Sequence, residues 1–394
     1  MSLSSVKFTR TDDSFLSRWF WTIDRSLLTA FGALIIFGVF MVTAASPAVA
    51  ERISLGPYHF LMRHLIILIP TVSCLIAFSF LSARNVWRLS SFILAGSIVA
   101  MALVLMVGME IKGAQRWLHL PGFSLQPSEF VKPSFAIVAA WLIAYQKTHE
   151  TFPANKICAA LFLVIVALLM LQPDLGMTMV VTSILATQIF LAGLPFRYLI
   201  IFGLAALTFL TLVYMSFGHV QSRIDRFLDP SSGDSYQIDK SLEAFRSGGV
   251  LGTGPGQGEV KLSLPDAHAD FIFSVAGEEL GLPLVFALIG LYLFVLLRGF
   301  HILMTSNCMF TVLAAGGLLV MFGLQSFIHM GSALQLLPAK GMTLPFVSYG
   351  GSSMLSMGIS MGMLLALLRR QENSALSKPR QAKEYREERP LDVR

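Results

Sequence analysis

The chain has 394 residues, of which 55% are hydrophobic and only 13% are charged, and its mean hydropathy is +0.70. Soluble globular domains carry about 25% charged residues, so this composition excludes them and indicates a polytopic membrane protein. The net charge of +6 does not call for a nucleic-acid partner, because the excess of lysine and arginine falls in segments expected to face the cytoplasm.

The sequence contains about ten apolar runs that are long enough to cross a bilayer as a helix, which takes roughly 20 residues. They lie near residues 26–46, 60–82, 90–108, 129–146, 155–172, 176–194, 198–217, 270–297, 309–330 and 346–369. We therefore predict an all-α fold, a helical bundle with about ten transmembrane helices. The first run follows a polar stretch and lacks the small-residue cleavage pattern of a signal peptide, so it is expected to remain as a span.

Basic residues in the short connections predict the orientation of this bundle. The even-numbered connections and both tails carry the positive charge and should face the cytoplasm; the residues in the connections are Arg84, Arg88, Lys147, Lys156, Arg197 and Arg298. Residues 1–25 then form a cytoplasmic N-terminal segment and residues 371–394 a basic, disordered cytoplasmic tail, on either side of a membrane domain at 26–370. A large extracytoplasmic loop at 218–269 joins the seventh and eighth helices.

Cysteine, histidine and glycine patterns do not predict a disulfide, a metal site or a nucleotide site. The three cysteines belong to different spans or their edges, none in a CxxC pair. His268 and Asp270 form an HxD pair, but two ligands do not make a metal site. "GGVLGTGPGQG", residues 248 to 258, has no preceding strand and no following GKS or GKT, so its glycines are expected to let a tightly turned backbone pack on the bundle.

Ionisable residues near the outer ends of the spans are the main functional candidates. Charges at membrane depth cost about 2.5 to 3.5 kcal/mol each on insertion scales, so a bundle keeps them mainly for a cavity, an ion pair or a reaction. The outward set is Arg63, Arg116, Glu129, Lys132, Asp174, Asp270, Glu278, Glu279 and Lys340. This set predicts an outward-facing polar cavity with one acid at its mouth and several cations around it, suited to an anionic, lipid-borne substrate.

Glu129 and Lys132 are three residues apart, so on a helix that begins near Pro127 they share a face and can neutralise one another. A purely structural ion pair in a capped helix is the alternative to a role in the cavity. Ser348 opens the motif "SYGGSSM", whose small residues most simply permit close helix contact.

Asp270 is expected at the mouth of the cavity, where the positive end of a helix dipole keeps a carboxylate ionised. It could act as a base or serve only as a helix cap. At helical spacing Asp270 and Glu278 could face one cavity, although Glu278 is two turns deeper and better suited to a structural role.

Seven motifs, in order, resemble the SEDS family of bacterial shape, elongation, division and sporulation proteins, over residues 27 to 370. They are "GAQRW", "QPSEFVK", "QPDLG", "FLDP", "GGVLGTGPGQG", "LPDAHADFIFSVAGEELG" and "LLPAKGMTLPFVSYGGSS". The endings "GEELG" and "LLPAKGMTLP" resemble the division branch more than the elongation branch. The chain departs from the family pattern at Ser263, His329 and Ala333.

The resemblance implies a peptidoglycan glycosyltransferase of the bacterial inner membrane that polymerises lipid II during septal synthesis, with a class B penicillin-binding protein and other division proteins as partners. It places the family's catalytic aspartate on Asp270 and the acid and lysine of its QPSE..K motif on Glu129 and Lys132. We assign Asp270 as general base and Lys132, Arg116, Arg63 and Lys340 as binders of the undecaprenyl pyrophosphate leaving group. A divalent cation, Mg²⁺ or Mn²⁺, is a further candidate to assist the pyrophosphate, with no ligands assigned to it.

A single base suits this chemistry. A pyrophosphate needs positive charge rather than a proton in order to leave, whereas glycosidases, whose leaving group is a poor alkoxide, use two carboxylates. Two other functions remain open: a lipid II flippase, which needs a polar path to the inner face, and a non-catalytic scaffold for division proteins.

Overall fold

The computed structural model describes residues 14–108, 110, 115–120, 123–193, 236–338 and 341–369, with isolated positions between 197 and 225. The chain divides into two units, one at Arg25–Leu368 and one formed by the segments outside it. Within the second unit, α1 (Phe15–Thr22) begins at Ser14, whose hydroxyl accepts a bond from Ser17 N. All other elements belong to the unit at Arg25–Leu368.

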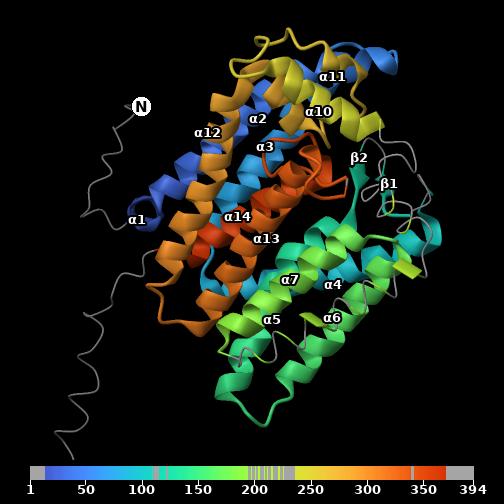
Figure 1. Cartoon of the computed structure of the whole chain (residues 1–394). Coiled ribbons are helices and arrows are strands. Elements are labelled where there is room, and N and C mark those ends of the chain that lie inside the picture. The colour runs from blue at the N-terminus through green and yellow to red at the C-terminus, as the bar shows by residue number, and fades with distance from the viewer. Residues whose placement is uncertain are drawn as a thin grey trace, which may run out of the picture. The chain divides into compact units, whose positions relative to one another are not determined.

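The larger unit is almost entirely helical, as predicted (Figure 1). Its helices are α2 (Arg25–Arg52), α3 (His59–Ser79), α4 (Ala83–Val107), α5 (Pro127–Thr148), α6 (Ala154–Leu171), α7 (Leu175–Leu191), α10 (Tyr236–Gly248), α11 (Val260–Ser263), α12 (Ile272–Leu303), α13 (Met309–Ala333) and α14 (Gly351–Leu367).

Nine predicted spans coincide with helices of the larger unit to within a few residues at most ends. By length and apolarity, six described helices can cross a membrane: α2, α3, α4, α6, α12 and α13. The apolar helices α7 and α14 are shorter, and α5 carries Glu129 and Lys132 in its first two turns. The predicted span at 198–217 lies largely outside the described residues, so the multi-span fold is confirmed but the count of ten is not.

The centre of this unit is built from α5, α13 and α14, whose side chains are buried along most of their length. Helix α14 packs on α3, and α13 packs on α5 and α7. A Cβ on Gly358 would lie 2.5 Å from Thr71 O, so glycine is required where α14 crosses α3. This close packing brings the middle of α14 directly against α3.

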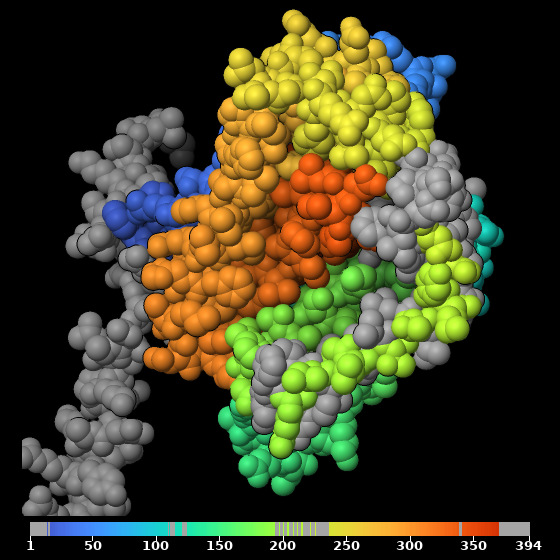
Figure 2. All heavy atoms as spheres, viewed as in Figure 1, coloured from blue at the N-terminus to red at the C-terminus, as the bar shows by residue number. Residues whose placement is uncertain are grey.

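Helix α12 is broken at Gly281, which has φ 70° and ψ −176°. The segment before the break packs on α10 and α11, which cover this end of the unit in Figures 1 and 2. A Cβ at Gly281 would lie 2.4 Å from Val250 O, so this backbone geometry brings the glycine-rich loop against the break. The predicted single span from 270 to 297 is therefore wrong at its start, where a short outer helix precedes the long one.

A small antiparallel hairpin, β1 (Leu118–Leu120) and β2 (Phe123–Leu125), precedes α5 and pairs Leu118 with Leu125. This hairpin was not predicted, because three-residue strands give too short an alternation of apolar and polar residues to recognise. The hairpin leads into Gln126, whose backbone N–H donates to Ser352 Oγ at the start of α14.

Candidate active site

Asp270 lies in the turn that precedes α12 and is half-buried. Its backbone N–H donates to Asp266 O at 2.9 Å, which closes a turn through Asp266 at φ 51°. The carboxylate faces the segment after α13: a Cβ built on Gly341 would lie 3.1 Å from Asp270 Oδ2. Glycine at 341 therefore lets this backbone lie directly against the carboxylate.

Residues 341–349, here called the strap, also hold the backbone of the two residues that precede this aspartate. Tyr349 N donates to His268 O at 2.9 Å, and Ser348 Oγ donates to Ala269 O at 2.7 Å. Ser348 also accepts from Leu344 N at 2.9 Å. The structure thus places the predicted Ser348 as a clamp on the backbone of Ala269, the residue before Asp270. In Figure 2 the region of the strap is orange-red and lies below the yellow segment that contains α10.

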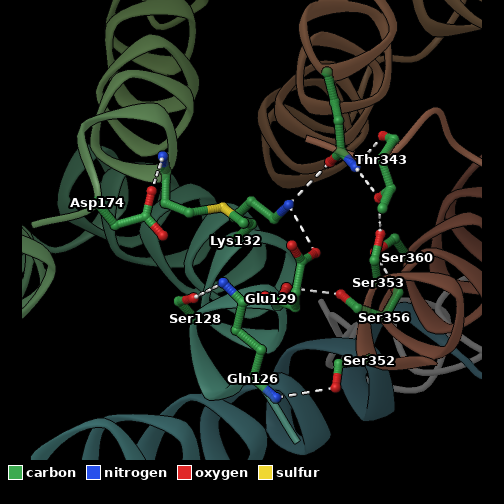
Figure 3. A network of polar contacts seen from close by, with 12 residues as sticks. Gln126, Ser128, Glu129, Lys132, Asp174, Thr343, Ser352, Ser353, Ser356 and Ser360 are labelled. Atoms are coloured by element: carbon green, nitrogen blue, oxygen red, sulfur yellow. Dashed lines mark hydrogen bonds and ion pairs between the residues drawn. The ribbon is translucent and has the colours of Figure 1, made fainter. Parts of the chain in front are cut away.

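Glu129 and Lys132 form a buried ion pair on the first turns of α5, as their spacing predicted, with Lys132 Nζ 2.8 Å from Glu129 Oε2. Lys132 is 1% exposed and also donates to Gln325 Oε1 of α13 at 2.9 Å (Figure 3). Gln325 Nε2 in turn donates to Thr343 O of the strap at 3.0 Å. The pair is therefore the buried end of a network that reaches the strap.

Arg116 and Asp174 lie together at the N-terminal end of α7, 3.8 Å apart. Asp174 caps α7 by accepting from Met177 N at 3.2 Å. Arg116 Nε donates to Gln172 O at 3.0 Å, and its Nη2 donates to Pro173 O. Both residues fasten the turn before α7, and Arg116 keeps part of its side chain exposed.

Arg63 is exposed on the first turns of α3 and interacts with the Tyr349 side chain. Tyr349 and Phe60 both pack on His268, with ring centroids 5.1 and 4.2 Å from it. Burial lowers the pKa of His268 to about 4, against a smaller raising effect of Asp266. Lys340 lies outside the described residues.

Glu278 and Glu279 bind the backbone of residues 256–261, which comprise the end of the glycine-rich loop (residues 248–258) and the start of α11. Glu278 accepts from Val260 N at 2.7 Å and Lys261 N at 2.9 Å, whereas Glu279 accepts from Gly256 N and pairs with Lys261 Nζ. Glu278 has the structural role favoured for it and does not share a cavity with Asp270, because its carboxylate is fully buried against residues 260 and 261. Lys261, which the sequence analysis did not single out, also donates to Ala44 O of α2.

The departures from the family pattern have partners of their own. His329 Nδ1 lies 2.7 Å from Met342 O of the strap, and Ser263 Oγ donates to Val260 O. Ala333 O accepts from Ser241 Oγ at 2.6 Å. His329 thus supports the strap, Ser263 supports α11, and Ala333 joins the end of α13 to α10.

A pocket of about 510 Å³ lies between the C-terminal half of α2 and residues 255–262. None of the predicted site residues lines it, although Lys261 does. Across the described part of the chain, no three His, Cys, Asp or Glu side chains are grouped closely enough to hold a metal ion.

The family model described as "Cell cycle protein", which covers FtsW, RodA and SpoVE, matches residues 24–373. The chain belongs to this SEDS family. A probable peptidoglycan glycosyltransferase FtsW of Caulobacter vibrioides is 43% identical over 92% of this chain and 93% of its own length. A protein of the same name from Geobacter metallireducens is 34% identical over 84% of this chain and 91% of its own. The division branch is therefore confirmed by its relatives.

Solved SEDS structures share the fold. One, from work on the structural coordination of polymerization and crosslinking by a peptidoglycan synthase complex, superposes with a TM-score of 0.72 at 30% identity, over 88% of this chain and 97% of that one. The rod shape determining protein RodA of Thermus thermophilus gives a TM-score of 0.65 at 28% identity, over 89% and 98%. The predicted membrane bundle is thus the fold of the family.

Gln325 and Thr343 are the site residues that sequence reasoning missed. A polar amide inside the apolar run at 309–330 is the signal that could have found Gln325, because a buried amide needs partners. Nothing in the sequence says that its partners are Lys132 and a strap backbone 18 residues farther along.

Proposed function

We propose that this protein is a peptidoglycan glycosyltransferase that polymerises lipid II at the outer face of the cytoplasmic membrane, during septal wall synthesis. Family membership and the names of its relatives support the reaction class. The single observation that carries the site is the placement of Asp270: a half-buried carboxylate on a turn in which the strap holds the backbone of the two preceding residues.

In this proposal Asp270 removes the proton from the attacking 4-hydroxyl of one lipid-linked disaccharide, whose oxygen then bonds to the anomeric carbon of another. The bond to undecaprenyl pyrophosphate breaks, and the electron pair leaves with the diphosphate. A general base must come within about 2.6 to 3.2 Å of the hydroxyl oxygen, so a fixed turn serves it better than a mobile one.

Positive side chains stabilise the charge that develops on the diphosphate. Arg63 and Arg116 are proposed for this role because both lie at the outer end and retain exposure, and Lys340 follows from its place next to Gly341. Lys132 is not proposed to contact the diphosphate, since its ammonium is buried and bonded to Glu129 and Gln325. No step is assigned to Mg²⁺ or Mn²⁺, because the described side chains offer no three-ligand group for it.

The distribution of buried charge favours polymerisation over transport. Among the described residues of the larger unit, the buried lysines and carboxylates are Glu129, Lys132, Asp174, Lys261, Glu278 and Glu279. All six lie within the first turns of their helices or just before them, at the end that carries Asp270. A flippase would need polar groups that continue to the opposite end.

The proposed partner is a class B penicillin-binding protein that crosslinks the strands as they form. A related fold is found in a synthase complex that couples polymerization and crosslinking. We place the protein in the inner membrane at the division septum, with both termini and the connection between α12 and α13 in the cytoplasm.

Purified protein, its penicillin-binding partner and fluorescent lipid II test this function directly. The expected result is glycan polymer with the parent protein and a loss of at least about 100-fold in rate with Asp270→Asn, which keeps the shape but loses the base. Equal polymer from both proteins would remove Asp270 as the base. Transfer of the head group across a vesicle membrane without polymer would instead establish the flippase.

A further inference from the structure

The strap is anchored from two helices as well as from the turn that it clamps. Thr343 accepts from Gln325 Nε2 of α13 at its carbonyl and, at 3.4 Å, at its hydroxyl. The same hydroxyl pairs with Ser353 Oγ of α14 (Figure 3). Gly341 and Thr343 are two residues apart, so the point anchored by Gln325 is adjacent to the point that touches the Asp270 carboxylate.

The side-chain amide of Gln325 is held in one orientation by its buried neighbours. It is 1% exposed, and its amide oxygen accepts from Lys132 Nζ. That contact orients the amide, because an ammonium only donates and must therefore face the oxygen. The amide nitrogen is then directed at Thr343. Lys132 is itself held by Glu129, so the ion pair of α5 determines which way Gln325 points.

We propose that Gln325 is a positioning residue for Asp270, acting through Thr343 and the strap. The buried Glu129–Lys132 pair orients its amide, its nitrogen fixes Thr343, and the strap then holds the backbone at 268–269 and lies against the carboxylate. This inference rests on the proposed function, since Asp270 is the base only if that function holds. A displacement of about 1 Å at a catalytic group can cost about 100-fold in rate, so an amide remote from substrate can control turnover.

Gln325→Met tests the proposal because methionine fills a similar volume and removes the hydrogen bonds to Lys132 and Thr343. The matched control is Gln188→Met. Gln188 is also buried, and its Nε2 also bridges two helices, donating to Ala136 O at 2.6 Å and Leu313 O at 3.2 Å. Its contacts do not involve the strap. A second pair, Thr343→Ser and Thr343→Val, keeps or removes the hydroxyl at the anchored point.

The expected result is a fall in kcat of about 10-fold or more for Gln325→Met, with KM for lipid II nearly unchanged, because the base is displaced and the lipid contacts are retained. Gln188→Met should keep kcat near the parent value while losing a comparable amount of thermal stability. Thr343→Ser should retain activity and Thr343→Val should lose part of it. A kcat for Gln325→Met equal to that of Gln188→Met would overturn the proposal.

Hydrogen–deuterium exchange supplies a readout that does not depend on polymerisation. Leu344 and Tyr349 donate their N–H groups within the strap and to His268 O, so peptides covering 341–350 should exchange faster in Gln325→Met than in the parent or in Gln188→Met. Unchanged exchange there would refute the strap mechanism even if the parent polymerises lipid II. A parent protein without polymerase activity but with this exchange pattern would instead refute the proposed function alone.

Discussion

At the scale of single residues, the Glu129–Lys132 pair is a buried charge pair whose partners depend on one another. Removing one member of such a pair typically costs about 3 to 5 kcal/mol, because the other charge remains buried without its counter-charge. We therefore expect Glu129→Gln and Lys132→Met each to lower the apparent melting temperature in detergent clearly. The double variant should recover part of the loss, since no buried charge is then left unpaired.

A thermal-shift comparison of the two single variants and the double variant measures this coupling. Lys240→Met is a suitable control, because Lys240 pairs with Glu243 at 2.6 Å but on an exposed surface of α10, where such pairs contribute little. If the double variant lost the sum of the two single losses, the pair would not act as a unit.

His268 predicts a pH dependence of stability at the site. Its pKa is about 4 in the folded protein, against 6.5 for a solvated histidine, because burial disfavours the charged ring. Between these two values the unfolded chain binds a proton that the folded chain does not. Stability is therefore complete above about pH 6.5 and falls by up to about 3 kcal/mol as the pH drops to about 4.

Melting curves of the parent and of His268→Phe at pH 7 and pH 5 measure this contribution. Phenylalanine keeps the contact with Phe60 and removes the titrating group, so the difference between the two pH values should shrink. His119→Phe, at an exposed position of β1, should leave it unchanged. An undiminished difference in His268→Phe would assign the pH dependence to other groups.

At the scale of elements, the break in α12 requires glycine at one position only. Gly281 has a backbone conformation that only glycine adopts readily, and an added Cβ would meet Val250 O. Gly281→Ala should therefore destabilise the protein strongly and free the glycine-rich loop. Gly290→Ala, in the same helix with nothing within 4 Å of the added Cβ, should be neutral or stabilising by up to about 1 kcal/mol.

Limited proteolysis at residues 250–262, together with melting temperature, distinguishes the two substitutions. The loop is held by Glu278 and Glu279 from the segment that precedes the break, so its release should expose new cleavage sites. Equal behaviour of the two alanine variants would show that the break is not needed to seat the loop.

Most helices of the bundle were predictable because apolar length alone identifies a span. The failures occurred where a helix does not cross the membrane in one piece. Hydropathy did not separate Ile272–Leu280 from the span after Gly281, since the first stretch is apolar up to Glu278 and runs directly into the second. Helical spacing allowed Glu278 to share a cavity with Asp270, but Asp270 lies in the turn before the helix and Glu278 binds the backbone at 260–261, which is the structural role favoured for it.

At the scale of the whole molecule, the proposed orientation can be checked with a native cysteine. Cys308 is exposed in the connection between α12 and α13, which we place in the cytoplasm, whereas Cys158 is buried. A membrane-impermeant maleimide should label Cys308 in inverted vesicles and not in intact spheroplasts. The Cys308→Ser variant should lose this labelling. Labelling of Cys308 in intact spheroplasts would mean that the connection between α12 and α13 faces outward, opposite to the proposed topology.

The candidate site was only partly predictable because its parts come from distant stretches of the chain. Charge at membrane depth identified Asp270, Glu129 and Lys132 one by one, and helical spacing predicted the ion pair. The strap contacts depend on α13 and α14 packing beside α5, which no local pattern encodes. Gln325 acquires its meaning only from that packing, and so does the clamp at Ser348.

The hydrogen bonds from Ser348 and Tyr349 to the backbone before Asp270 also set a time for the site to form during synthesis. The ribosome finishes the aspartate turn about 80 residues before it reaches the segment that clamps it. If Asp270 has the proposed role, a nascent chain should stay inactive until the strap has been synthesised. Truncated products that end before residue 341 would contain Asp270 without the backbone contacts that hold its turn.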